Sequence, residues 1–206
     1  MIGAVDGKAG AFAWRGKLTA GDASFRDLFT SGTTNRQIQA QINSANNFIM
    51  SMRNAANVVQ MTMQSSGVTL NVAAGDLLIL ASWDVASNLK HLYINDVSRL
   101  GTNTLTDDVL KFATTQAIGV LAESDGAPAT TGETDYVYFG AEYIDLSNSA
   151  TRAKFSSATD MSYWGKGPTG NRPLVYAWGD AASWNGGTAN KGGGGPFTAT
   201  GAFTDA

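Results

Sequence analysis

The sequence predicts an all-β fold: an antiparallel two-sheet sandwich of the jelly-roll type. Segments of strand length with alternating apolar and polar residues recur between residues 37 and 72, and a strong hairpin pattern follows at residues 77–97. Glycine accounts for 24 of the 206 residues, which suits tight turns between many strands. No sustained helical period separates these segments, so we expect the strands to form two packed sheets.

The composition excludes several classes of function. The chain has no cysteine, so it can have no disulfide framework, thiolate nucleophile or cysteine-ligated zinc. A formal net charge of −3 argues against a surface that binds nucleic acid, which needs clustered Lys and Arg. No window approaches the ~20 apolar residues of a membrane helix, and residues 1–15 carry several charges instead of an apolar leader. We therefore expect a soluble, unexported protein that does not enter a membrane.

Residues 1–34 allow two interpretations. They mix small and polar residues with isolated aromatics such as Phe25, and they show no sustained period. The segment is either an arm laid on its own sandwich or on a neighbouring subunit, or the first short strands of the domain. The sequence thus predicts two parts: residues 1–34 as an N-terminal arm or first strands, and residues 35–206 as the β-sandwich domain.

The central part of the chain predicts four successive strands. Alternation at residues 37–42 places apolar side chains on one face and glutamines on the other. Residues 48–53 and 58–64 repeat the pattern, and residues 68–72 follow after a Ser-Ser-Gly turn. This spacing is typical of a meander or a jelly roll.

Residues 77–97 predict a hairpin. An apolar run at residues 77–81 ends at Trp83 and Asp84, Asn88 marks the turn, and the second strand carries Tyr93. We expect Trp83 and Tyr93 to help fix the two strands.

The later sequence predicts fewer elements. Residues 109–121 suggest one or two strands, residues 123–134 a surface loop, and residues 136–146 a strong strand. A polar cluster before residues 150–155 predicts one helical turn, and residues 174–178 predict the last strand.

Two stretches resemble known families. A strand that closes on Ser-Trp-Asp at residues 82–84, followed by a turn and Leu-Tyr-Ile-Asn-Asp at residues 92–96, resembles the central hairpin of concanavalin A-like, laminin-G-like sandwich domains. The segments at residues 143–147, 152–155, 167–173 and 190–198 are similar to a C-terminal pattern of virion proteins in tailed bacteriophages. The first resemblance implies a lectin- or glucanase-type jelly roll.

The second resemblance implies a structural role in a phage particle. The protein would be a capsid decoration, tail or fibre component, made in the bacterial host cytoplasm and located in the virion. It would bind the major capsid or tail proteins and copies of itself, and mediate adhesion without enzymatic activity. The alternative is a lectin-like module that binds host or environmental glycans.

The sequence contains no complete set of catalytic residues. His91 is the only histidine and lies within a predicted strand, which favours a structural role over that of a catalytic base. Glu133 and Asp135 match the first half of a glycosidase Glu-x-Asp-x-Glu pattern, but the second glutamate is missing. Glu142 and Asp145 are three residues apart and would point to opposite faces of a regular strand. The sequence therefore predicts no catalytic residues and no enzyme.

The sequence evidence for a cofactor site is equally weak. Calcium is the one candidate, because oxygen ligands lie at or near predicted strand ends. These residues are Asp84, Asn95, Asp96, Asp107 and Asp108. Turn capping explains them more simply, so no cofactor or metal is expected. The glycines at residues 192–195 lack the Lys and Ser/Thr of a phosphate-binding loop.

A late group of aromatic residues is the candidate contact site for a glycan or a protein. It comprises Tyr163, Trp164, Trp178 and Trp184, together with Tyr176. Such rings stack on sugars or anchor interfaces, although packing in the core is the more common use of large aromatics.

Overall fold

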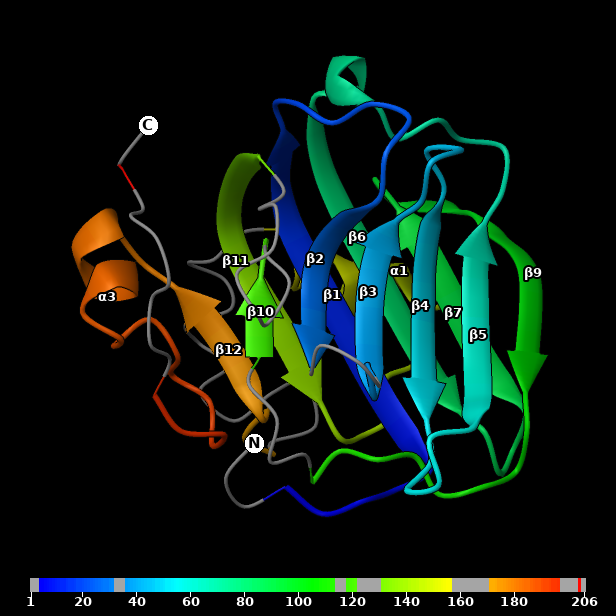
Figure 1. The fold of residues 1–206 in the computed structure, drawn as a ribbon. Helices are drawn as coiled ribbons and strands as arrows, with labels where there is room; N and C mark the ends of the chain where they lie inside the picture. Colours follow the sequence, from blue (N-terminus) through cyan, green and yellow to red (C-terminus); the bar gives the residue numbers. More distant parts are fainter. Residues whose placement is uncertain are drawn as a thin grey trace.

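The chain forms a sandwich of two six-stranded sheets (Figure 1), as the sequence predicts. The computed structural model describes residues 4–31, 36–113, 118–121, 131–156, 171–196 and 204. All strand pairs within both sheets are antiparallel. No helix within the described ranges has the length and hydropathy that crossing a bilayer requires.

The front sheet in Figure 1 carries most of the strands predicted in the first half of the chain. Its order is β10 (Ile118–Val120), β2 (Arg26–Ser31), β3 (Ile38–Ile42), β4 (Phe48–Arg53), β5 (Val59–Ser65) and β9 (Leu100–Leu105). The order of the back sheet is β12 (Val175–Trp178), β11 (Gly132–Gly140), β1 (Ala9–Leu18), β6 (Asp76–Asp84), β7 (Leu89–Ile94) and β8 (Val97–Ser98).

Residues 1–34, for which the sequence allowed an arm or first strands, contribute one strand to each sheet. β1 is a central strand of the back sheet and pairs with both β6 and β11. β2 pairs with β3 across the boundary suggested at residue 34. The described part of this segment therefore lies within the sandwich.

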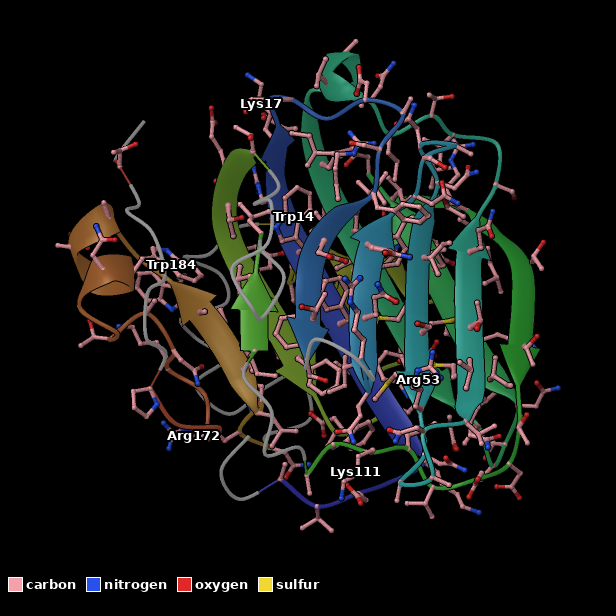
Figure 2. The ribbon with its side chains drawn as sticks, viewed as in Figure 1. Trp14, Lys17, Arg53, Lys111, Arg172 and Trp184 are labelled. Carbon is pink, nitrogen blue, oxygen red and sulfur yellow. The ribbon has the colours of Figure 1, made fainter. Side chains whose placement is uncertain are left out.

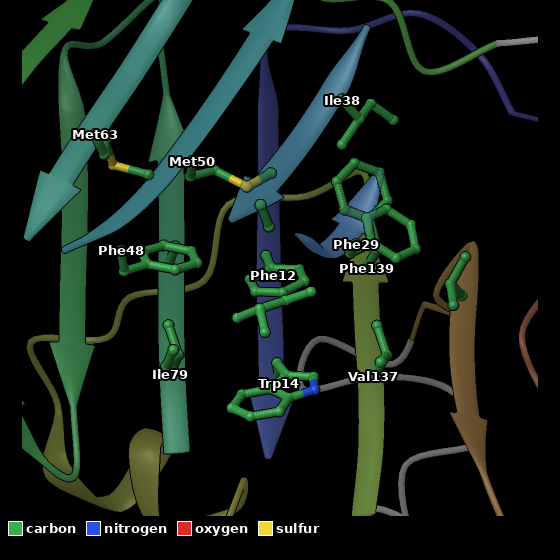
Figure 3. Close-up of a cluster of buried hydrophobic side chains, with 14 of the residues drawn as sticks. Phe12, Trp14, Phe29, Ile38, Phe48, Met50, Met63, Ile79, Val137 and Phe139 are labelled. Carbon is green, nitrogen blue, oxygen red and sulfur yellow. The ribbon is translucent and has the colours of Figure 1, made fainter. Parts of the chain in front are cut away.

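The core lies between the two sheets and is rich in aromatic rings (Figure 3). Phe12 stacks on Phe48 with ring centroids 6.0 Å apart, and Phe29 stacks on Phe139 at 5.6 Å. Methionines such as Met50 fill the spaces between the rings. Unbranched Met suits such irregular gaps because its thioether chain adapts its shape.

The predicted hairpin is confirmed as β6 and β7. Trp83 is fully buried in the core, and Tyr93 on the other face lies under the guanidinium of Arg152, 4.2 Å from its ring centroid. The predicted helical turn is also confirmed, as α1 (Ser149–Ala153), where the Asn148 side chain accepts a hydrogen bond from the Ala150 amide.

Several predictions about local structure are wrong. The strand predicted at residues 136–146 ends with β11 at Gly140, and residues 141–146 form no strand. Residues 68–71 form no strand, and the 3₁₀ helix η1 (Val72–Ala74) follows them. Their backbone bonds to other loops instead, because the Leu70 amide donates to the Asn46 carbonyl and the Val72 amide donates to the Asp22 carboxylate. The C-terminal section also contains a helix that the sequence pattern did not predict, α3 (Ala181–Asn185), which Asp180 caps.

The loop predicted at residues 123–134 and the strands predicted at residues 109–121 are only partly described. Residues 132–134 belong to β11 instead of the loop, and residues 122–130 lie outside the described ranges. Within residues 109–121, residues 118–120 form β10, and Leu110 makes a single β-bridge to Gly7.

Candidate functional site

The outer face of the front sheet is polar because its strands alternate. In β4, Phe48, Met50 and Met52 point into the core, so Ser51 and Arg53 point outward. The same alternation in β3 buries the apolar residues and turns the glutamines outward. Figure 2 shows Arg53 at the lower end of β4, away from the β1–β2 loop at the top.

The strand register aligns the outward side chains into rows that cross the sheet. One row consists of Thr30, Gln39, Ser51, Thr62 and Thr104, each directly opposite the next. A second row consists of Asp27, Gln41, Ile49 and Gln64. Neighbouring strands lie about 4.8 Å apart, so each row is a closely spaced series of hydrogen-bonding groups. We call these nine residues the polar face.

A hydrogen-bond network fixes the amides at the β2–β3 side of the polar face. The Gln39 Nε2 donates to Gln41 Oε1 at 2.8 Å and lies 3.5 Å from Asp27 Oδ1. Asp27 also pairs with Arg36, with the guanidinium nitrogen 3.4 Å from a carboxylate oxygen. Because Asp27 is buried, this ion pair holds its carboxylate in place and offsets its charge.

The β4–β5 side of the polar face is more open. Ser51, Thr62 and Gln64 are partly exposed, and their side chains form no hydrogen bond to any residue that the structure describes. Ile49 adds a partly exposed apolar side chain beside them. Hydroxyls and amides both donate and accept hydrogen bonds, so this side can bind a ligand rich in hydroxyl groups.

The outer face of the back sheet is covered. Ile144, Leu146 and Phe155 pack on it with the outward residues of β1, β6, β11 and β12. The Ile144 amide donates to the Ser82 hydroxyl at 2.9 Å, and the Tyr136 hydroxyl donates to the Phe155 carbonyl. We call residues 144–155 the covering segment, because they cover the outer face of the back sheet. On the front sheet Asp27, Thr30 and Gln41 are buried, whereas the β4–β5 side of the polar face is exposed.

His91 lies at the edge of this covering segment. Its Nε2 is 2.7 Å from the Tyr143 hydroxyl and 3.7 Å from the Asp145 carboxylate. Burial lowers the pKa of the His91 imidazole. The Asp145 carboxylate opposes this shift, and the positive charge of Arg152 adds to it. This arrangement joins β7 to residues 143–152, which agrees with the structural role expected from the sequence.

The predicted aromatic contact residues do not form one group among the described residues. Tyr163 and Trp164 lie outside the described ranges. Trp184 of α3 is 6 % exposed and belongs to the main core, whereas Trp178 and Tyr176 of β12 pack with the cluster on the outer face of the back sheet. Trp178 is partly exposed, and the Lys191 ammonium lies 5.8 Å from its ring centroid.

The four candidate acids lie apart from the polar face. Glu133 and Asp135 are exposed near the start of β11, and Asp135 pairs with Arg15 at 2.9 Å. Glu142 accepts a hydrogen bond from Asn171, while Asp145 accepts from Ser147. The hydrogen bonds from Ser147 lower the pKa of Asp145.

The candidate calcium ligands have local partners. Asp84 and Asn95 accept backbone hydrogen bonds in turns, and Asp96 pairs with Arg152. Asp107 pairs with Lys8, and Asp108 accepts from Asn54. Within the described residues, no three His, Asp or Glu side chains gather closely enough to hold a metal ion.

The signal for the polar face was present in the sequence, since the glutamines of β3 alternate with apolar residues. Its extent was not, because the rows depend on how five strands align. None of the nine residues of the polar face was therefore among the predicted site residues.

Comparison with known proteins reveals similarity only at the level of structure. No protein-family model and no curated protein matches the chain. The CBM40 domain of the Ruminococcus gnavus IT-sialidase, solved with α2,6-sialyllactose, is 13 % identical, with a TM-score of 0.51 over 68 % of this chain and 80 % of that one. A Bacteroides ovatus protein to which carbohydrate binding has been ascribed is 10 % identical, with a TM-score of 0.58 over 85 % of this chain and 46 % of that one. These likenesses establish a lectin-like jelly-roll sandwich.

Proposed function

We propose that this chain is a non-catalytic carbohydrate-binding module whose ligand lies on the polar face of the front sheet. The observation that carries the proposal is the row of hydroxyls and amides formed by Gln39, Ser51, Thr62 and Thr104, which the register places side by side and which are partly or fully exposed. The sandwich fold shared with carbohydrate-binding domains supports the same function.

The chemistry of the polar face fits a neutral glycan. The hydroxyls of Ser51 and Thr62 and the amide of Gln64 match sugar hydroxyls, which also donate and accept hydrogen bonds. Ile49 offers an apolar contact for the C–H groups of a sugar ring. Asp27 is the one charged residue among the nine, and its carboxylate is already paired with Arg36. The Arg53 guanidinium, at the lower end of β4, donates to the Asn57 carbonyl instead of pointing along the rows.

The absence of an enzymatic role is part of this proposal. The polar face contains a single carboxylate, that of Asp27, whereas glycosidases of the usual kind need two. Glu133 and Asp135 lie on β11 of the other sheet.

The virion role implied by the sequence resemblance stays a prediction, as do a virion location, self-association and partnership with capsid or tail proteins. The two structural relatives above are not described as virion proteins. A glycan-binding face is compatible with an adhesive role on a particle, so the two predictions differ in where the protein is found and not in how the face binds.

The test is titration calorimetry of the whole chain with neutral tetrasaccharides of β-glucan, xylan and α-glucan, and with sialyllactose as an acidic sugar. We expect at least one neutral sugar to bind and the Ser51→Arg variant to weaken it more than about tenfold, by filling the centre of the face. Ser98→Arg is the matched control, because Ser98 is an exposed strand serine on the back sheet. Absence of binding to every sugar contradicts the proposal. Equal binding by both serine variants and the unmodified chain contradicts the position of the site, and a preference for sialyllactose contradicts the neutral ligand.

A further inference from the structure

Phe25 is unusually exposed for a phenylalanine. Its exposed fraction is 65 %, and it is the one aromatic residue among the large exposed hydrophobic side chains of the described ranges. It immediately precedes β2 and lies two residues before Asp27 of the polar face. Alternation continues the outward-facing series to Phe25, because Arg26 between them is turned inward and only 2 % exposed.

The loop that carries Phe25 is held in one conformation. The Ser24 amide and hydroxyl both donate to the Gly21 carbonyl, at 3.2 and 2.6 Å. The Ala23 amide lies 3.4 Å from the Asn46 side-chain oxygen, and Ala23 has a φ of 58°, which a residue with a Cβ rarely adopts. Non-glycine residues held in this region often belong to binding sites, where the surrounding structure maintains the strain.

Arg26 anchors the same loop from below. Its guanidinium donates to the Leu70 carbonyl at 2.7 Å and to Asn46 Oδ1 at 2.5 Å, and it lies 3.4 Å from the Asp22 carboxylate. Burial lowers the pKa of Arg26, and the charge of Asp22 opposes this shift. The buried guanidinium therefore ties three loops together and keeps Phe25 directed to solvent before any ligand arrives, which reduces the entropic cost of binding.

The surroundings of the ring select the kind of ligand. Residues 20–24 are small or polar and exposed, so a flat ligand can approach the ring closely. A protein partner usually buries a wider apolar patch around its aromatic anchor. A sugar ring is polar around its rim and apolar on one face, which matches a single aromatic ring beside a surface of amides and hydroxyls.

We propose that Phe25 is the stacking residue for one sugar ring of the glycan bound by the polar face. This inference rests on the proposed function and adds a specific contact at the end of β2. The ligand then extends from Phe25 along the row that ends at Ile49 and Gln64, on the exposed β4–β5 side of the face. Phe25 supplies the aromatic contact that the nine residues of the polar face lack.

The test measures binding of the tightest neutral tetrasaccharide to the whole chain and to two variants at this position. Phe25→Ala should weaken binding about tenfold, whereas Phe25→Trp should keep it within about threefold, because a larger ring still stacks. Both variants should unfold at the same temperature as the unmodified chain, since the side chain is exposed. Val97→Ala is the matched control, because Val97 is another exposed apolar residue, on β8 of the other sheet.

The outcomes separate this inference from the proposed function. If Phe25→Ala binds as well as the unmodified chain while Ser51→Arg does not bind, the stacking role is wrong and the polar face stands. If Phe25→Ala loses binding while Ser51→Arg retains it, the stacking role stands and the position of the ligand on the sheet is wrong. If the unmodified chain binds none of the sugars, both proposals fail.

Discussion

The outer faces of the two sheets have opposite characters. The front sheet presents threonines, glutamines and serine, whereas the back sheet presents apolar and tyrosine side chains that residues 144–155 cover. Both sheets bury their inner faces in the same core. Outward side chains at the β4–β5 side of the front sheet contact solvent, and the proposed ligand would bind there. Outward side chains of the back sheet contact residues 144–155.

The strand sequences reflect this difference. β4 buries every second residue, as expected for a sheet with one face in the core. β6 and β11 contain continuous apolar runs, and five successive residues of each are buried. A continuous run therefore indicates that both faces of a strand are covered, and alternation indicates that one face is free.

The largest expected effect contrasts the two outer faces directly. Leu80 is 1 % exposed on the covered face, so Leu80→Ala should lower the free energy of unfolding by about 2–5 kcal/mol. Ile49→Ala, on the open face, should cost less than about 1 kcal/mol. Urea denaturation monitored by tryptophan fluorescence measures both. Similar losses at the two positions would mean that the faces are equally covered.

A smaller effect is expected where the covering segment is attached. Ser82 donates to the Gly10 carbonyl at 3.3 Å and accepts from the Ile144 amide, and its side chain is fully buried. Ser82→Ala leaves the amide without a partner and should cost about 1–3 kcal/mol. Ser98→Ala is the control and should change stability by less than about 0.5 kcal/mol. Faster hydrogen exchange at the Ile144 amide in Ser82→Ala would identify the local cause, and unchanged stability would show that this bond does not attach the segment.

The fold was largely predictable because local patterns determine it. Alternation at β3, β4 and β5 and the apolar run of β6 are properties of a few neighbouring residues. β1 was harder to identify, because Ala11 and Ala13 on its covered face are too small to stand out beside Phe12 and Trp14. The strand predicted at residues 68–72 failed for another reason: Asp22, Arg26 and Asn46, distant in the sequence, bind its backbone.

The candidate site was much less predictable. That Gln39 points outward follows from β3 alone, but its position opposite Ser51 depends on the turns and bulges that set the register. The exposure of Phe25 depends on a buried arginine that joins three loops. By contrast, Trp184 resembles a binding residue in the sequence but packs in the core, since ring size alone does not distinguish the two environments.

The smallest expected effect is a pH dependence that arises from the covered side. His91 is the only histidine, and burial lowers its pKa below the unfolded value of about 6.5. Between these two pKa values the unfolded chain binds a proton that the folded chain does not. Stability should therefore fall as the pH decreases through about 6.5 and level off below the folded pKa. The groups that face the imidazole are Tyr93, Tyr143, Asp145 and Arg152.

Urea midpoints measured between pH 7.5 and 5 test this prediction. His91→Gln removes the titrating group, so its midpoint should change less over this range than that of the unmodified chain. Carboxylates titrate mainly below this range, and the pKa of Asp145 is itself lowered by its hydrogen bonds from Ser147, so its contribution is lost only at more acidic pH. Ile49→Ala serves as the control, because a change on the polar face should leave the slope unaltered. A slope that persists in His91→Gln would assign the pH dependence to groups other than the histidine that links β7 to the covering segment.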